Sequence, residues 1–208
     1  MKSSDLITER RSITFFDPNA ELSSSKIKEL IDLANLAPSS MNLQPWEVIV
    51  IKDKEKKAGL KECAFNQAKV QEASAVFIII ADNHAVEENL ERCLDDWVKL
   101  GYLKNQEKEN YRQMAFNLYG KPNSEARKIF AIKNASFFAM NLMVAAKTMG
   151  IETHPLDGFD QAMIKKEFKI DEDKFIPLLI AIGQPIKDLK LLPRAYRRDF
   201  AEYVSILG

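Results

Sequence analysis

The sequence is poor in cysteine, histidine and glycine, and each shortage excludes a class of protein. Cys63 and Cys93 are the only cysteines among 208 residues, too few for a framework of disulfides. With His84 and His154 they make four candidate metal ligands, but the spacing matches no zinc motif, so we predict no metal site. The seven glycines form neither a phosphate-binding loop nor a dinucleotide fingerprint, which argues against a nucleotide held in either way.

The chain also lacks an excess of charge and a long apolar run. Lysine plus arginine number 30, as do aspartate plus glutamate, so we expect no nucleic-acid partner, although a local anion site remains open. The longest apolar runs, 75–81 and 175–183, are far shorter than the ~20 residues of a membrane-spanning helix. The N-terminal residues do not resemble a signal peptide. These features predict a cytoplasmic protein without a membrane partner.

Hydrophobic periodicity predicts one α+β domain over residues 1–208, with a small sheet surrounded by helices. Helices are expected at 3–9, 23–36, 53–62, 124–149 and 160–168, with two more between 86 and 119 that break near Gly101. Strands are expected at 46–51, 75–81, 151–154 and 176–182. The centre of the longest helix, FFAMNLMVAA at 137–146, is apolar on nearly all sides, which predicts burial in the protein or at a subunit interface.

Arginines gather near both ends of the chain. Arg10 and Arg11 follow the first predicted helix, where they either interact with the helix dipole or, with Ser12, bind a phosphate. A guanidinium pairs with two phosphate oxygens at once, so the residues alone leave both interpretations open. Three late arginines are candidates for the same site: Arg194, Arg197 and Arg198.

Neutral polar groups mark three further segments. Between Pro38 and Pro45 lie four side chains that either belong to a helix-terminating loop or suit a polyol or a heterocycle: Ser39, Ser40, Asn42 and Gln44. Asn66 and Lys69 are expected on one face of a helix. Residues 155–158 are predicted to form a turn after a strand, with backbone N–H groups free for a ligand. His84 and His154 have no catalytic partners nearby in the sequence, so we interpret both as ordinary polar residues.

Taken together, five segments resemble the nitroreductase family of homodimeric FMN proteins. They are ERRSI, APSSMNLQPW, FNQAK, PLDGFD and the late basic cluster, in the order and spacing of the family over essentially the whole chain. The resemblance implies the nitroreductase-like fold, in which helices surround a small, mainly antiparallel sheet. It also implies an FMN site that two subunits share.

The resemblance assigns each segment to a part of FMN. Five residues would hold the phosphate: Arg10, Arg11, Ser12, Arg194 and Arg197. From the partner subunit, Pro38, Ser39 and Ser40 would line the ring pocket. Asn42 and Gln44 would reach the ribityl chain or the ring. Asn66 and Lys69 would meet the O2/N3 edge of the ring. The ring face would lie against Pro155, Leu156, Asp157 and Gly158, with a backbone N–H of one of the last two directed at N5.

Two positions depart from the family pattern. Many nitroreductases carry a basic residue where Thr14 stands, near the N1/O2 edge of the flavin, and Glu is frequent where Asp157 stands. If Thr14 lies at that edge, Lys69 is the single cation beside it; alternatively, Thr14 faces the core with Phe15 and Phe16. In the tail, Arg197 and Arg198 are both candidates for the phosphate.

The implied activity is transfer of a hydride from NADH or NADPH through flavin N5 to a nitroaromatic, quinone or similar acceptor, in a ping-pong scheme. The flavin would carry the chemistry, so no catalytic side chain is expected. The resemblance leaves other family reactions open, including enone reduction, reductive dehalogenation and flavin fragmentation. A different class of function also remains, that of a protein that binds FMN as a reservoir or regulator without turnover.

Overall fold

The centre of the protein is a four-stranded antiparallel sheet with the strand order β1-β2-β4-β3. The computed structural model describes residues 3–208. The strands are β1 (Trp46–Ile51), β2 (Ala75–Ala81), β3 (Glu152–Leu156) and β4 (Phe175–Gly183). Because β1 and β3 each pair with one neighbour, they form the two edges of the sheet. The predicted α+β fold is confirmed.

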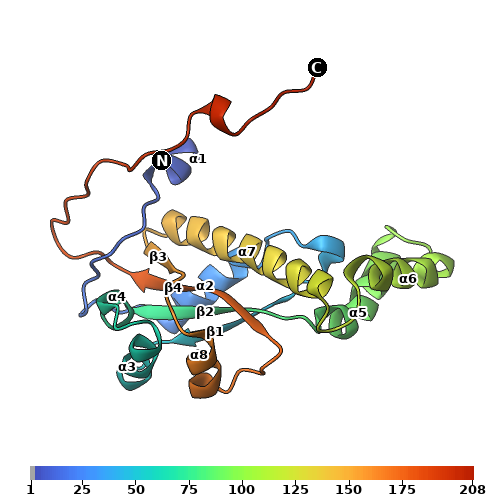
Figure 1. Ribbon diagram of the computed structural model, residues 1–208, viewed down its shortest axis with the longest axis horizontal. Helices are drawn as coiled ribbons and strands as arrows, with labels where there is room; N and C mark the ends of the chain where they lie inside the picture. The colour runs from blue at the N-terminus through green and yellow to red at the C-terminus, as the bar shows by residue number, and fades with distance from the viewer. Residues whose placement is uncertain (1–2) are drawn as a thin grey trace.

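Helices cover both faces of this sheet, as Figure 1 shows. One face carries α2 (Ser24–Ala34) and the long helix α7 (Glu125–Thr148), and the other carries α3 (Lys54–Cys63) and α8 (Gln161–Phe168). The helices α5 (Ala85–Leu100) and α6 (Lys108–Tyr119) form a helix pair beyond one end of the sheet. Shorter elements complete the chain: α1 (Ser3–Glu9), η1 (Ser40–Asn42), α4 (Ala68–Glu72), η2 (Asn105–Glu107) and η3 (Phe200–Glu202).

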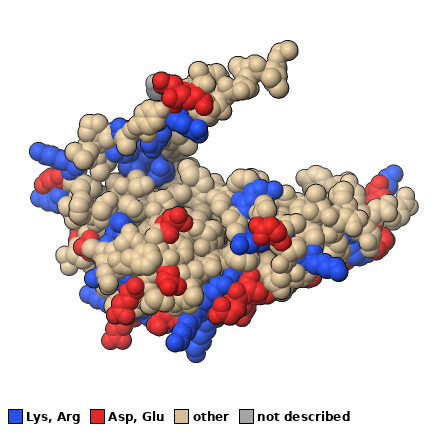
Figure 2. Space-filling model, in the orientation of Figure 1, with Lys and Arg blue, Asp and Glu red and all other residues tan. Residues whose placement is uncertain are grey.

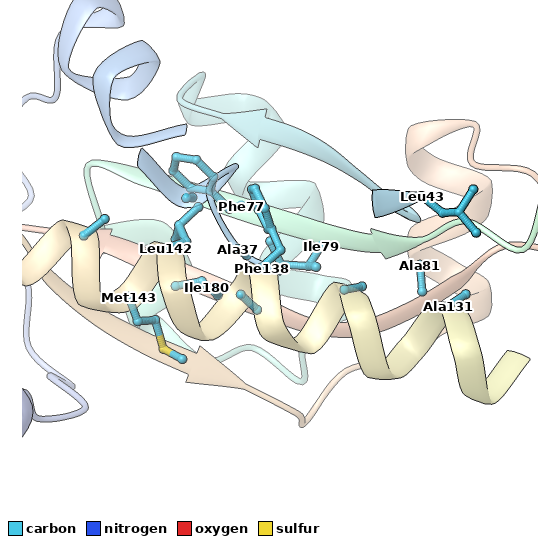
Figure 3. Close-up of a cluster of buried hydrophobic side chains, with 14 of the residues drawn as sticks. Ala37, Leu43, Phe77, Ile79, Ala81, Ala131, Phe138, Leu142, Met143 and Ile180 are labelled. Carbon is cyan, nitrogen blue, oxygen red and sulfur yellow. The ribbon is translucent and has the colours of Figure 1, made fainter. Parts of the chain in front are cut away.

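The strand β2 is buried along its whole length, which explains its uninterrupted apolar sequence. Alternate residues point to opposite faces, so Phe77 and Ile79 pack toward α7 in one core cluster. Ile78 and Ile80 pack in the second cluster, with residues of α3 and α8. Figure 3 shows the first cluster, in which Phe138 and other side chains of α7 meet those of β2.

Most predicted boundaries are confirmed to within a few residues, and β3 ends two residues later than predicted. The strand was expected to end at His154, and it continues through Pro155 and Leu156. Pro155 has no N–H to donate, and a proline is tolerated in β3 because this strand lies at the edge of the sheet. The predicted turn therefore begins later, and Pro155 cannot supply one of its backbone donors.

The helix α7 has two different faces. Phe138, Leu142 and neighbouring residues are buried, whereas Phe137 and Met140 are 46% and 43% exposed and Ile129 is 56% exposed. By length and hydropathy α7 could cross a membrane, yet 56% of its most apolar window is buried inside the protein. A core helix of a folded domain has the same composition. The exposed apolar side chains favour a subunit interface for the second face.

The C-terminal segment after β4 lies away from the sheet. It follows the N-terminal part of the chain, passes α1 and ends beyond it (Figure 1). Nearly all of its side chains from 190 onward are exposed, including the apolar Ile206 and Leu207. Its position beside α1 brings the late arginines toward the early ones.

Candidate functional site

Residues 10–14 run beside the edge strand β3, and we call them the arginine arm. Ile13 N–H donates to the carbonyl of Thr153 at 3.0 Å, and Ser12 forms a parallel bridge with Thr153. Ile13 itself is buried, so the side chains before and after it in the chain are directed elsewhere. Thr14 is exposed, which rules out the interpretation that it packs in the core.

The guanidiniums of Arg11 and Arg194 fasten the arginine arm to the C-terminal tail. Arg11 Nη2 donates to the carbonyl of Leu192 at 3.1 Å. Arg194 Nη2 donates to the carbonyl of Arg10 at 3.0 Å and also to that of Thr8. Basic side chains consequently gather where α1 and the tail meet the body of the protein, as Figure 2 shows. The predicted association of early and late arginines is present for Arg194.

Arg10 carries a buried nitrogen, Nη1, that has no hydrogen-bond partner within residues 3–208. A buried donor without a partner loses its hydration and gains nothing in return, at a cost of ~1–3 kcal/mol or more for a charged group. An anion at this position would remove that cost and form a charge-assisted hydrogen bond. This favours the anion-binding interpretation of the arm over a simple interaction with the dipole of α1.

Arg197 lies farther along the tail. Its Nη1 donates to the carbonyls of Ala195 and Tyr196, its own neighbours, and the side chain is exposed. Arg198 instead stacks on the ring of Tyr203 with 5.0 Å between guanidinium and ring centre. Within this protomer neither residue joins Arg10, so the choice between them for the phosphate stays a prediction.

A second cluster joins α4 to the turn after β3. Lys69 Nζ donates to Gln67 Oε1 at 2.9 Å, and Gln67 Nε2 donates to the carbonyl of Gly158 at 2.7 Å. Gln67 was not among the predicted site residues, because its partner Gly158 lies 91 positions away in the sequence.

One prediction for this cluster is wrong. Asn66 and Lys69 do not share a helical face, because α4 begins at Ala68 and Asn66 precedes it in a left-handed conformation with φ of 58°. Asn66 is exposed, and its N–H donates to the carbonyl of Lys61. Its side chain therefore remains available to a ligand, although not in the helical arrangement that the spacing indicates.

His154 lies between the arginine arm and this cluster. Its Nδ1 is 3.0 Å from the carbonyl oxygen of Ile13. Burial lowers the pKa of His154 below its usual value, and the positive charge of Lys69 lowers it further. The hydrogen bond to Ile13 opposes this shift in part. The ring is therefore neutral near pH 7.

The loop 38–45 is held by side chains from two helices. Asn134, fully buried in α7, accepts a hydrogen bond from Ser40 N–H at 3.0 Å. On α5, Asn89 Nδ2 donates to the carbonyl of Leu43 at 2.9 Å, and Cys93 Sγ donates to that of Asn42 at 3.2 Å. Met41, Asn42 and Gln44 all have positive φ, an unusual run for residues other than glycine. The loop is thus a supported structure and not only the end of α2.

A cavity of about 940 Å³ opens beside this loop. It lies between α2, β1 and α5, and its lining includes Asn42, Gln44 and Trp46 together with the charged Arg92 and Lys99. No residue of the arginine arm or of the Lys69 cluster contributes to it. The neutral polar loop and the basic arm therefore open on different parts of one protomer.

The sheet register shows how far apart these two parts are. The loop leads directly into Trp46, which pairs with Ala81 at one end of β2. At the other end, Ala75 pairs with Ile182 of β4. Ile182 also pairs with Thr153 of β3, which lies beside the arginine arm. Six residue-to-residue steps along β2 separate the two ends, which is about 20 Å at ~3.4 Å per step. The two groups also lie toward opposite edges, β1 and β3.

Comparison with known proteins identifies the family to which these segments belong. The profile of the Nitroreductase family matches residues 7–184, from within α1 to the residue after β4. The chain is a nitroreductase-family member. This confirms the resemblance drawn from the five segments and the fold expected from it.

Relatives of this nitroreductase-family chain match over most of their length. YodC of Bacillus subtilis, provisionally named an NAD(P)H nitroreductase, is 36% identical over 184 residues, which cover 88% of this chain and 89% of YodC. A CLA biosynthesis enone reductase of Lactiplantibacillus plantarum is 29% identical over 192 residues, which cover 88% of this chain and 86% of that protein.

Solved structures extend this likeness to the fold. The nitroreductase YdfN of B. subtilis, so named provisionally, superposes with a TM-score of 0.91 at 30% identity, covering 98% of each chain. A provisionally named nitroreductase of Exiguobacterium sibiricum, solved in complex with FMN, gives a TM-score of 0.86 at 28% identity, covering 99% of this chain and 97% of that one.

Proposed function

We propose that this nitroreductase-family protein is an FMN-dependent oxidoreductase that transfers reducing equivalents from NAD(P)H to a small organic acceptor. The observation that carries the proposal is the buried Nη1 of Arg10, which has no partner among the described residues and lies in an arm with further guanidiniums. FMN has an anionic head that this arm fits and a ring whose polar edge suits Lys69 and Asn66. The E. sibiricum relative solved with FMN supports the same cofactor.

The chain's own residues bind and orient the cofactor. Ser12, Arg10, Arg11 and Arg194 would hold the phosphate, while the turn at Asp157 and Gly158 would lie against the ring. Bound FMN supplies reversible hydride chemistry at its N5 atom. The sequence has no dinucleotide fingerprint, which supports a single place for the pyridine nucleotide and the acceptor in turn. That arrangement corresponds to a ping-pong scheme, in the cytoplasm where NAD(P)H is available.

Anaerobic titration of the FMN-loaded protein with NADH and with NADPH tests this function. Bleaching of the flavin absorption band, followed by its return on addition of a nitroaromatic or quinone, is the expected result. A band that neither nucleotide changes would instead support a reservoir or regulatory protein. An enone is the second acceptor to test, because the enone reductase of L. plantarum is among the relatives.

The loop 38–45 would complete the site from a second protomer. About 20 Å separates it from the arginine arm within one chain, at the usual rise per strand residue. A homodimer brings the loop of one protomer to the arm of the other if the exposed face of α7 forms the interface. Phe137, Met140 and Ile129 supply that face with apolar surface.

The homodimer is expected to be permanent. We predict an interface well above ~2,000 Å² of buried surface, the range for obligate dimers. Sedimentation of the FMN-loaded protein at micromolar concentration should give one species with twice the mass of the chain. Met140→Glu, which places a charge on the proposed interface, should shift it to monomer and release FMN. A stable FMN-loaded monomer of the unaltered protein contradicts this prediction.

Thr14→Lys should raise the midpoint potential of the bound flavin. A cation beside the N1/O2 edge stabilises the negative charge that gathers there on reduction, and Thr14 is exposed, so a lysine is tolerated. A partly screened charge at ~4–6 Å contributes on the order of 1–3 kcal/mol. For a two-electron couple this is some tens of millivolts, at about 30 mV per 1.4 kcal/mol. Redox titration against a reference dye measures the shift.

Thr14→Gln is the matched control, since it adds length and polarity without charge. Its potential should stay close to that of the unaltered protein. An unchanged or lowered potential in a well-folded Thr14→Lys protein would remove the electrostatic role of this position.

A further inference from the structure

His154 interacts with both the arginine arm and the Lys69 cluster. It lies on β3, in register with Ala181 of β4. Its Nδ1 is 3.0 Å from the carbonyl oxygen of Ile13, the middle residue of the arm. The positive charge of Lys69 also acts on the ring and lowers its pKa. The imidazole of His154 therefore contacts the arginine arm and interacts electrostatically with Lys69.

The hydrogen bond to Ile13 determines the tautomer of His154. A carbonyl oxygen only accepts, so Nδ1 must carry the hydrogen, and in the neutral ring Nε2 is left as an acceptor. Protonation adds a hydrogen to Nε2 and leaves the Nδ1–H bond to Ile13 intact. The ring can thus gain a charge without releasing the arm.

Few charged groups face this ring. Lys69 on α4 is the charged residue whose field acts on it, and it opposes protonation. On β4 the paired residue is Ala181, which is uncharged, and the arm presents the backbone of Ile13. On β3 itself, Glu152 is engaged with Lys147 at 2.6 Å. Among the described residues, no carboxylate acts on His154 to offset the charge of Lys69.

We propose that His154 is a positioning residue of the flavin site, holding the arginine arm and, when protonated, adding a second cation beside Lys69 that favours reduced over oxidised FMN. This inference rests on the proposed function. The two electrons come from NAD(P)H, and the extra proton on His154 comes from solvent. Because negative charge gathers on the ring edge in the reduced state, a nearby imidazolium is attracted to it, and this attraction offsets the repulsion from Lys69.

Linkage makes this coupling reciprocal. If protonated His154 favours reduced FMN, reduction of FMN must raise the proton affinity of His154 by the same factor. Burial lowers the pKa of His154 and Lys69 lowers it further, so the ring is neutral at pH 7 and becomes charged as the pH falls. The additional stabilisation of reduced FMN is therefore expected on the acidic side of neutrality and absent on the alkaline side.

Two substitutions separate the hydrogen bond from the charge. In His154→Asn, the amide nitrogen lies the same number of bonds from Cα as Nδ1, so a donor to Ile13 remains while titration is lost. His154→Leu removes both. At pH 8 we expect His154→Asn to bind FMN as the unaltered protein does, and His154→Leu to bind it several-fold more weakly. Equal affinity of all three proteins would overturn the positioning role.

The decisive measurement is the midpoint potential between about pH 5 and pH 8, the interval in which histidines titrate. The potentials of the unaltered protein and of His154→Asn should agree at the alkaline end. They should diverge as the pH falls, with the unaltered protein higher. Each tenfold gain in proton affinity on reduction corresponds to about 30 mV for a two-electron couple. Parallel curves over the whole interval would overturn the charge coupling.

A test without the cofactor checks the contact with Lys69 on its own. The chain has two histidines, so His154→Asn assigns both imidazole signals in an NMR titration of the apoprotein. Lys69→Met should raise the pKa of His154 and leave that of His84 unchanged. His84 is a suitable reference because its pKa is raised by a hydrogen bond to Asp173, away from this site. An unaltered His154 pKa in Lys69→Met would refute the coupling.

These outcomes distinguish the inference from the function on which it rests. Failure of the purified protein to bind FMN overturns both. Binding and bleaching of FMN, together with parallel potentials for the unaltered protein and His154→Asn, leave the proposed function intact and overturn the inference alone.

Discussion

Arg127→Met should lower the free energy of unfolding by about 3–5 kcal/mol, the usual range when one partner of a buried ion pair is removed. Arg127 is fully buried at the start of α7. Its Nη1 and Nη2 both meet the carboxylate of Glu87 on α5, the second at 3.0 Å. Met keeps much of the apolar volume of the arginine side chain but has no hydrogen-bond donor. The substitution therefore removes mainly the hydrogen bonds and the ion pair of Arg127.

Arg127 also satisfies three backbone carbonyls, two of them in buried contacts. Nη1 donates to that of Asn83 at 2.8 Å, Nε to that of Tyr119 at 3.3 Å and Nη2 to that of Gly120 at 2.5 Å. These carbonyls belong to the segment before α5 and to the end of α6. Arg127 therefore joins the helix pair α5–α6 to the central helix α7, and its loss should loosen this helix pair first.

Urea unfolding at fixed protein concentration measures the effect, since oligomerisation makes stability concentration-dependent. For a domain of this size the loss corresponds to a fall in melting temperature of roughly 2–4 °C per kcal/mol. Arg112→Met is the matched control, because Arg112 pairs with Glu91 and Glu109 on the surface of the same helix pair, α5–α6. Similar stability of the two variants would show that the buried network contributes little.

Features set by neighbouring residues were predictable from the sequence. Four helices are capped at their start by a side-chain oxygen, from Ser23, Asp53, Ser124 and Asp160. Each of these helices begins within a residue or two of its predicted start. The strands β1 and β2 match their predicted ranges. In each case the decisive interaction spans three or four residues or the alternation of one strand, so the local pattern contains it.

Contacts between distant segments were not predictable in this way. The bonds of Gln67 to Gly158 and of Asn134 to Ser40 join residues 91 and 94 positions apart. Nothing in the local sequence distinguishes these amides from ordinary surface residues. Arg127 offered one signal, a guanidinium in the first turn of an apolar helix, where a cation is unfavourable beside the helix dipole unless it has a partner.

In the candidate site, the residue types were predictable from the sequence, but their arrangement in space was not. Family resemblance supplied the residue types, including Arg10, Ser12 and Lys69, whereas the sheet register supplied their grouping at one end of β2. Sequence interpretation also treated Arg10 and Arg11 alike. The structure separates them, because Arg11 already donates to Leu192 while Nη1 of Arg10 has no partner within residues 3–208.

That difference leads to the second large effect. Arg10→Ala should weaken FMN binding by about 1.5–3 kcal/mol, the range for hydrogen bonds to charged groups, which is roughly a 10- to 150-fold rise in Kd. Arg11→Ala should act in the same direction. The loss for Arg10 should be the larger, since its buried nitrogen is the donor that an anion would satisfy.

Riboflavin separates a phosphate contact from a general effect on the site, because it has the ring and ribityl chain of FMN without the phosphate. Fluorescence titration should show that Arg10→Ala binds riboflavin as the unaltered protein does, while its affinity for FMN falls. Arg112→Ala, a surface arginine on α6, should change neither affinity. If Arg10→Ala lost affinity for both ligands equally, Arg10 would not contact the phosphate, and the unpaired nitrogen would need another partner, such as the partner subunit's tail.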